Sequence, residues 1–120
     1  MEADRNRLVQ VISNLLNNAI TFTKDNATID LRVINKIDVA DTHQQLVVVS
    51  VKDSGSGITP EMLPRLFSKF ATKSDFGTGL GLFISKGIIE AHNGKIWAQN
   101  NVDQKGATFA FSLPTYLASK

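Results

Sequence analysis

Apolar side chains recur every three or four positions over residues 5–22, which predicts an amphipathic helix with one buried face. The positions on its apolar arc are Leu8, Ile12, Leu15, Leu16, Ala19 and Phe22. Asp4 stands directly before this segment, where a carboxylate can cap the first backbone N–H groups. A second apolar period runs from Leu82 to His92 and predicts a second helix that begins near Leu80.

Alternation of apolar and polar residues predicts four strands. They cover residues 27–33, 46–51, 95–99 and 107–113. Between the second and third strands, Thr59 followed by Pro60 predicts the start of a short helix that reaches about Phe67. The chain is therefore expected to contain both helices and strands throughout its length.

Composition narrows the class of protein. A chain of 120 residues, with 42% apolar and 20% charged residues, fits one soluble globular domain over residues 1–120. It has no apolar run long enough for a membrane span and no signal-peptide pattern, so we expect a cytoplasmic domain without membrane contact. The absence of cysteine excludes disulfides, thiolate metal sites and cysteine nucleophiles. A net charge of +2, with no basic block interleaved with aromatics, gives no support for nucleic-acid binding.

A glycine-rich stretch opens the late helix and suits an anion. It reads Gly77-Thr78-Gly79-Leu80-Gly81-Leu82. Glycine lets backbone N–H groups approach a ligand closely, and a helix N-terminus adds partial positive charge, which together favour phosphate. The spacing matches neither the dinucleotide-binding fingerprint nor the P-loop. An ordinary flexible loop before a helix is the alternative interpretation.

Two asparagines four positions apart, Asn14 and Asn18, lie on one stripe of the first helix. Their carboxamide oxygens could hold a hard cation such as Mg²⁺ whose charge is already partly neutralised by phosphates. A solvated polar face is the alternative.

An acidic residue, Asp53, ends the second predicted strand and is followed by Gly55 and Gly57. A carboxylate at this point could accept a hydrogen bond from the exocyclic amine of a base, and the glycines would leave room for a flat ring. A turn that begins with Asp and uses glycine for positive φ is the alternative. Lys73 is the one cation close in sequence to the glycine-rich stretch.

In this order along the chain, the asparagine pair, the Asp-x-Gly-x-Gly stretch and the glycine-rich stretch resemble the catalytic, ATP-binding domain of sensor histidine kinases. This domain belongs to the GHKL superfamily, which includes gyrase, Hsp90 and MutL. The stretches that resemble its N, G1, F and G2 boxes are residues 4–23, 53–58, 66–70 and 77–82. Residues 90–97 and 106–109 resemble its closing helix-turn-strand and its final strand.

The resemblance implies a Bergerat-type ATP-binding fold, which is a two-layer α/β sandwich. A mixed β-sheet would be covered on one face by three helices, with ATP between the helix layer and a lid. The resemblance also implies a role for each matched residue. Asn18, with Asn14 beside it, would hold the Mg²⁺ that bridges the phosphates of ATP. Asp53 would accept from the adenine amine, and Thr108 would join it through a water.

The remaining implied roles concern the pocket and the lid. Gly55 and Gly57 would shape the adenine pocket, and Ile58 would line it. Residues 77–81 would form the hinge and the phosphate-facing backbone, and these comprise Gly77, Thr78, Gly79, Leu80 and Gly81. Phe67 and Phe70 would anchor the lid, and His92 would be structural.

Two departures from the family pattern bear on the phosphates. Many of these kinases carry a lysine where this chain has Thr21. The lid, residues 71–76, is also short for the family, which makes Lys73 the candidate for phosphate contact.

Position 14 distinguishes kinase from hydrolase within the superfamily. In the hydrolases and serine kinases a glutamate at this position takes a proton from water or hydroxyl, whereas Asn14 cannot act as a base. A histidine acceptor already has a free lone pair, so position 14 favours transfer to histidine. A regulatory pseudokinase, an ATP hydrolase and an unrelated two-layer binding domain are the alternatives.

The acceptor is expected on another domain, because neither His43 nor His92 lies in a His-Glu-x-x-x-Pro-like context. The resemblance implies a histidine on a dimerisation domain of the same protein and a response-regulator aspartate as the final recipient. Met1 stands directly before a helix-like segment, so we expect a domain cut from a longer protein. Since dimerisation would come from the other domain, this chain alone should be monomeric.

Overall fold

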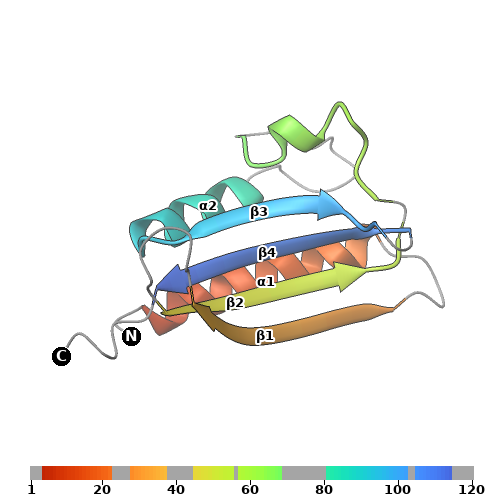
Figure 1. Cartoon of the computed structure of the whole chain (residues 1–120). Helices are drawn as coiled ribbons and strands as arrows, with labels where there is room; N and C mark the ends of the chain where they lie inside the picture. The colour runs from red at the N-terminus through yellow and green to blue at the C-terminus, as the bar shows by residue number, and fades with distance from the viewer. Residues whose placement is uncertain are drawn as a thin grey trace.

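In the part of the chain that the structure describes, four strands form one sheet in which every pair of neighbours is antiparallel. The computed structural model describes residues 4–22, 28–37, 45–55, 57–68, 81–102 and 105–114. The elements in chain order are α1 (Arg5–Phe22), β1 (Ile29–Ile37), β2 (Gln45–Asp53), the 3₁₀ turn η1 (Leu63–Arg65), α2 (Gly81–Ala91), β3 (Lys95–Asn100) and β4 (Ala107–Pro114). The strand order is β1-β2-β4-β3, so β2 and β4 are the central pair (Figure 1).

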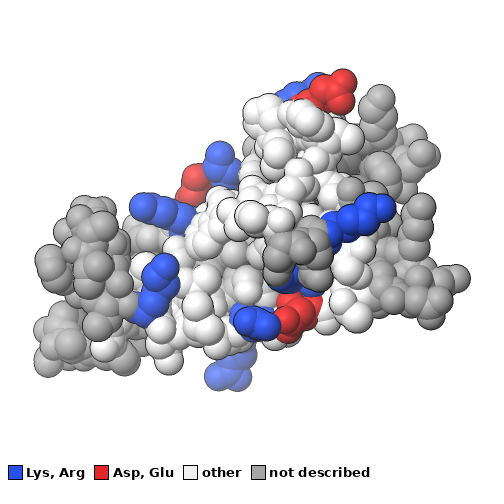
Figure 2. All heavy atoms as spheres, turned by 45° about the vertical axis from the view of Figure 1, so that its right-hand side comes forward, with Lys and Arg blue, Asp and Glu red and all other residues white. Residues whose placement is uncertain are grey.

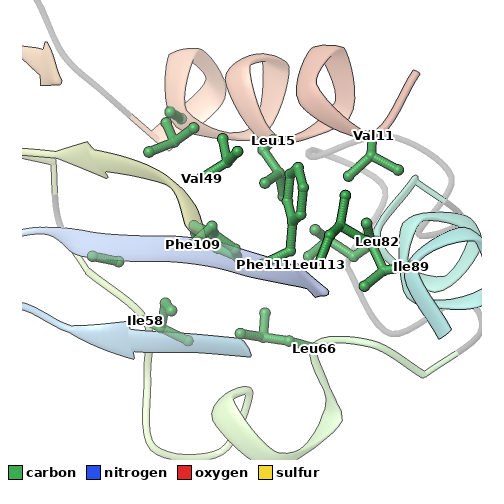
Figure 3. Close-up of a cluster of buried hydrophobic side chains, with 13 residues drawn as sticks. Val11, Leu15, Val49, Ile58, Leu66, Leu82, Ile89, Phe109, Phe111 and Leu113 are labelled. Carbon is green, nitrogen blue, oxygen red and sulfur yellow. The ribbon is translucent and has the colours of Figure 1, made fainter. Parts of the chain in front are cut away.

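Both helices pack on the same side of this sheet. Figure 1 shows α1 behind β2 and β4, with α2 alongside β3. Figure 3 shows Leu15 of α1 facing Phe111 of β4, with Leu82 and Ile89 of α2 at one end of the same cluster. Phe109 and Phe111 are at most 1% exposed, which places the two central aromatic rings in the middle of the core. Burial of this face holds the two layers together.

Residues next to each helix define where it starts or stops. Asp4 caps α1 as predicted, because its Oδ1 accepts from Arg7 N at 3.2 Å. Asn93, with φ of 63°, ends α2 in the left-handed conformation. His92 donates from Nδ1 to Ile88 O at 2.8 Å, and its Nε2 accepts from Asp4 N at 3.0 Å. This histidine therefore ties the end of α2 to the start of α1, consistent with its predicted structural role.

The predicted helix 5–22 and the α+β class are confirmed, and several details differ. All described strand pairs are antiparallel, whereas a mixed sheet was expected. The predicted helix from Thr59 to Phe67 is only a 3₁₀ turn. Thr59 does cap this segment, accepting from Met62 N at 3.3 Å. Pro64 has no N–H to donate within an α-helix, and its ring would clash with the preceding turn of such a helix, which disfavours an α-helix through this position.

Strand β1 extends to Ile37, beyond the end predicted at Val33. Its polar residues Asn35 and Lys36 pair with β2 in register, because ladder hydrogen bonds use the backbone and do not require alternating side chains.

On the face that Figure 2 shows, basic side chains are spread out and do not gather in one patch. One of the described cations, Arg32, pairs with Asp30 at 3.0 Å.

We expect Phe111→Ala to destabilise the domain by roughly 3–5 kcal/mol, because it leaves a cavity between α1 and the sheet. Phe83→Ala is the matched control, since Phe83 is 42% exposed on α2. Exposed substitutions usually change the free energy of unfolding by about 0.5 kcal/mol or less. Urea unfolding measures both variants. Equal losses would contradict the assignment of the core.

Candidate functional site

The carboxylate of Asp53 is buried with half of its hydrogen-bonding capacity unused. Asp53 ends β2 on the same face as Val49 and Val51 and is 1% exposed. Its Oδ1 accepts from Gly55 N at 2.9 Å and from Ala107 N at 3.3 Å. Its Oδ2 is also buried and has no partner among the described residues. An unsatisfied buried acceptor is costly, so this oxygen is suited to a ligand that brings an N–H donor.

The close approach of the β3–β4 turn depends on Gly106. This residue has φ of +106°, and a Cβ added to it would lie 2.0 Å from Asp53 O. Only glycine permits both the conformation and the contact. The turn thereby brings Ala107 N to the carboxylate, a contact that the sequence motif did not reveal.

Asn100, at the end of β3, holds the backbone of the G1 stretch. Its Oδ1 accepts from Ile58 N at 2.7 Å, and its Nδ2 donates to Ile58 O at 2.9 Å. Gly57 has φ of +85°, and a Cβ there would lie 3.0 Å from Asn100 Oδ1. The Ile58 side chain belongs to the core cluster (Figure 3), so its predicted contact with adenine stays a prediction.

The structure does not bring the Thr108 hydroxyl to the Asp53 carboxylate. Thr108 pairs with Lys52, the residue before Asp53, and strand alternation places it on the opposite face of the sheet. Its hydroxyl donates to Asn101 Oδ1 at 2.7 Å, and Asn101 Nδ2 donates to Asp53 O at 2.9 Å. Thr108 thus reaches the backbone of Asp53 through Asn101, while Ala107 is the residue of β4 that contacts the carboxylate.

Asn14 of α1 lies against the start of α2. Asn14 Nδ2 donates to Gly81 O at 3.2 Å and to Ser85 Oγ at 3.0 Å. These bonds use both of its N–H groups and leave Oδ1 as an acceptor. Asn18 Nδ2 is buried and has no partner among the described residues. The polar stripe of α1 that carries Asn14 and Asn18 is therefore not merely a solvated face.

The other predicted site residues lie outside the described residues. They are Phe70, Lys73, Gly77, Thr78, Gly79 and Leu80, together with the lid over 71–76. His43 and the side chain of Thr21 are also outside. Phe67, the other predicted lid anchor, is partly buried and packs against the core.

The donor set limits the kind of cation that this site could hold. Among the described residues, no group of three His, Cys, Asp or Glu side chains could hold a metal ion. Neutral amide oxygens such as Asn14 Oδ1 fit Mg²⁺ only when phosphates supply most of the negative charge.

In the part of the chain that the structure describes, no helix is long and apolar enough to cross a membrane.

Comparison with known proteins agrees with this geometry. Residues 3–117 match the family model of histidine kinase-, DNA gyrase B- and HSP90-like ATPases. The chain is 42% identical to the sensor protein FixL of Bradyrhizobium diazoefficiens over 93% of the chain's own length. It is 35% identical to the sensor histidine kinase WalK of Bacillus subtilis over 95% of its length. It spans 21% of the former relative and 19% of the latter.

Solved structures show the same fold. The catalytic domain of the histidine kinase ThkA aligns with a TM-score of 0.78 and 41% identity, covering 95% of this chain and 71% of that one. Full-length ShkA in complex with AMPPNP aligns with a TM-score of 0.76 and 33% identity, covering 93% of this chain and 22% of that one. The chain therefore belongs to the family of histidine kinase-, DNA gyrase B- and HSP90-like ATPases, as a catalytic domain of the sensor histidine kinase type.

Proposed function

We propose that this domain binds Mg-ATP and transfers its γ-phosphoryl group to a histidine on a separate dimerisation domain of the same protein. The observation that carries the proposal is the buried, unpartnered Oδ2 of Asp53. The family match supports a general role in nucleotide binding and phosphoryl transfer, and ShkA was solved with AMPPNP.

Recognition of adenine would follow from the hydrogen-bonding pattern of Asp53. Because Oδ1 accepts from two backbone N–H groups, the carboxylate is held in one orientation with Oδ2 as the free acceptor. The exocyclic amine of adenine offers the donor that this oxygen lacks. Guanine carries an oxygen at the corresponding ring position, which would place two acceptors together and leave both unsatisfied.

The phosphates would lie toward α1 and α2. Asn14 holds Gly81, the first residue of α2, and retains an acceptor oxygen. Asn18 Nδ2 is a buried donor with no described partner, and the start of a helix favours negative charge. When bound, Mg²⁺ would neutralise phosphate charge that develops during transfer. The glycine-rich stretch and Lys73 remain predicted contributors on the phosphate side.

The choice of acceptor follows from Asn14. Its amide nitrogen is committed to Gly81 O and Ser85 Oγ, and an amide cannot take a proton from water. Histidine needs no such base, so transfer to a histidine on a partner domain is favoured over hydrolysis. A response-regulator aspartate would then receive the group. A cytoplasmic location and a monomeric isolated domain also remain expectations.

We expect Asp53→Asn to weaken ATP binding roughly 10- to 100-fold, which corresponds to losing a charge-assisted hydrogen bond. The substitution preserves shape but can replace the free acceptor by an amide donor. Asp30→Asn, on β1, is the control because that carboxylate is partly exposed and pairs with Arg32. Calorimetric titration with Mg-ATP measures both. Unchanged affinity in a folded Asp53 variant would remove the central support for the nucleotide site.

Removal of Asn18 should reduce the effect of magnesium. We expect the gain in ATP affinity on adding Mg²⁺ to fall about tenfold in Asn18→Ala, as for loss of an interaction of about 1.4 kcal/mol. Asn17→Ala, one position away and exposed on α1, should retain the full gain. Titrations with and without Mg²⁺ give both gains, and equal gains in the two variants would argue against a metal role for Asn18.

The isolated chain should bind ATP without stable self-labelling. Incubation with γ-labelled ATP should leave no stable label on this chain alone. When the dimerisation domain is added, its histidine should become labelled. Steady phosphate release by the isolated chain would support the hydrolase alternative. Binding without transfer, even with the histidine-bearing domain joined, would support the pseudokinase alternative, for which Thr21 and the short lid are the sequence arguments.

A further inference from the structure

Two neighbouring side chains at the end of β3 hold opposite ends of the segment that would contact the base. Asn100 bonds both backbone groups of Ile58, at 2.7 Å and 2.9 Å. Among the described residues, the N–H and C=O of Ile58 have no other hydrogen-bond partner. The described hydrogen bonds that hold the Ile58 backbone to β3 therefore come from one side chain.

Asn101 performs the corresponding task at Asp53. Its Nδ2 donates to Asp53 O at 2.9 Å and to Lys105 O at 3.1 Å. Its backbone N–H donates to Gly106 O at 2.9 Å. The same side chain thus joins the end of β2 to the β3–β4 turn, which brings Ala107 N to the carboxylate.

The orientation of both amides is fixed by their partners. Carbonyl oxygens only accept, so the nitrogen of Asn101 must face Asp53 O and Lys105 O. Its oxygen then faces Thr108, whose hydroxyl donates at 2.7 Å. The same reasoning places the nitrogen of Asn100 against Ile58 O. A flip of either amide would lose these bonds.

We propose that Asn100 and Asn101 are positioning residues of the base pocket. They set the distance between the Asp53 carboxylate and the Ile58 backbone before the nucleotide arrives, so that little ordering is left to occur on binding. This inference rests on the proposed nucleotide site. It also gives Thr108 a role that does not require contact with the base, because its hydroxyl orients Asn101.

Binding of ADP and GDP by calorimetry tests the proposal. We expect Asn100→Ala to raise the Kd for ADP about tenfold and to reduce the preference for ADP over GDP, because the pocket loses its fixed shape. Gln99→Ala is the matched control, since Gln99 is the preceding residue of β3, is exposed, and points to the opposite face. It should bind ADP like the unmodified chain.

A second variant, Asn100→Asp, keeps the acceptor for Ile58 N and replaces the donor to Ile58 O. It should also lose affinity and base preference while preserving side-chain volume. The proposal is overturned if both folded Asn100 variants retain the original Kd and base preference within twofold, even if their unfolding midpoints fall, because Asn100 would then be scaffold only. No ADP binding by the unmodified chain would instead refute the proposed function, and this inference with it.

Discussion

The buried carboxylate of Asp53 is the constraint on which the site depends. Two backbone N–H groups, from Gly55 and Ala107, satisfy one of its oxygens, and the other oxygen is left without a described partner. Burial of a polar atom without a hydrogen bond costs on the order of 1–3 kcal/mol. The burial of an apolar core around Phe109 and Phe111 stabilises the fold and offsets this loss of free energy. A ligand that donates a hydrogen bond to this oxygen would remove the penalty. The same buried oxygen therefore affects both the stability of the domain and the binding of a ligand.

Side-chain amides join the separate pieces of the site. Asn14 links α1 to the start of α2, and Asn100 and Asn101 link the end of β3 to the G1 stretch. Asn100 and Asn101 each donate and accept, so they can replace a missing strand partner for an irregular segment. Irregular backbone next to a site is thereby held without regular secondary structure. The amide at position 14 cannot act as a base, which is one argument for the proposed transfer to histidine over hydrolysis.

Several features of the protein could be predicted from the sequence alone, because they follow from local patterns. The 3.6-residue period gave α1 with the observed bounds Arg5–Phe22, and alternation gave the approximate positions of all four described strands. Asp4 as a cap and Asp53 at a strand end were likewise readable from neighbouring residues. The order of motifs indicated the family, which the match over residues 3–117 confirmed.

Tertiary structure decided what depends on residues far apart in the chain. The bonds from Asn100 to Ile58, from Asn101 to Asp53 and from Ala107 to Asp53 span 42, 48 and 54 residues, and no local pattern encodes them. Sheet register placed Thr108 on the face opposite Asp53, and pairing with β2 extended β1 through polar residues to Ile37. Periodicity determines which residues can be buried. Packing and register alone determine which buried polar atoms meet, and these contacts define the site.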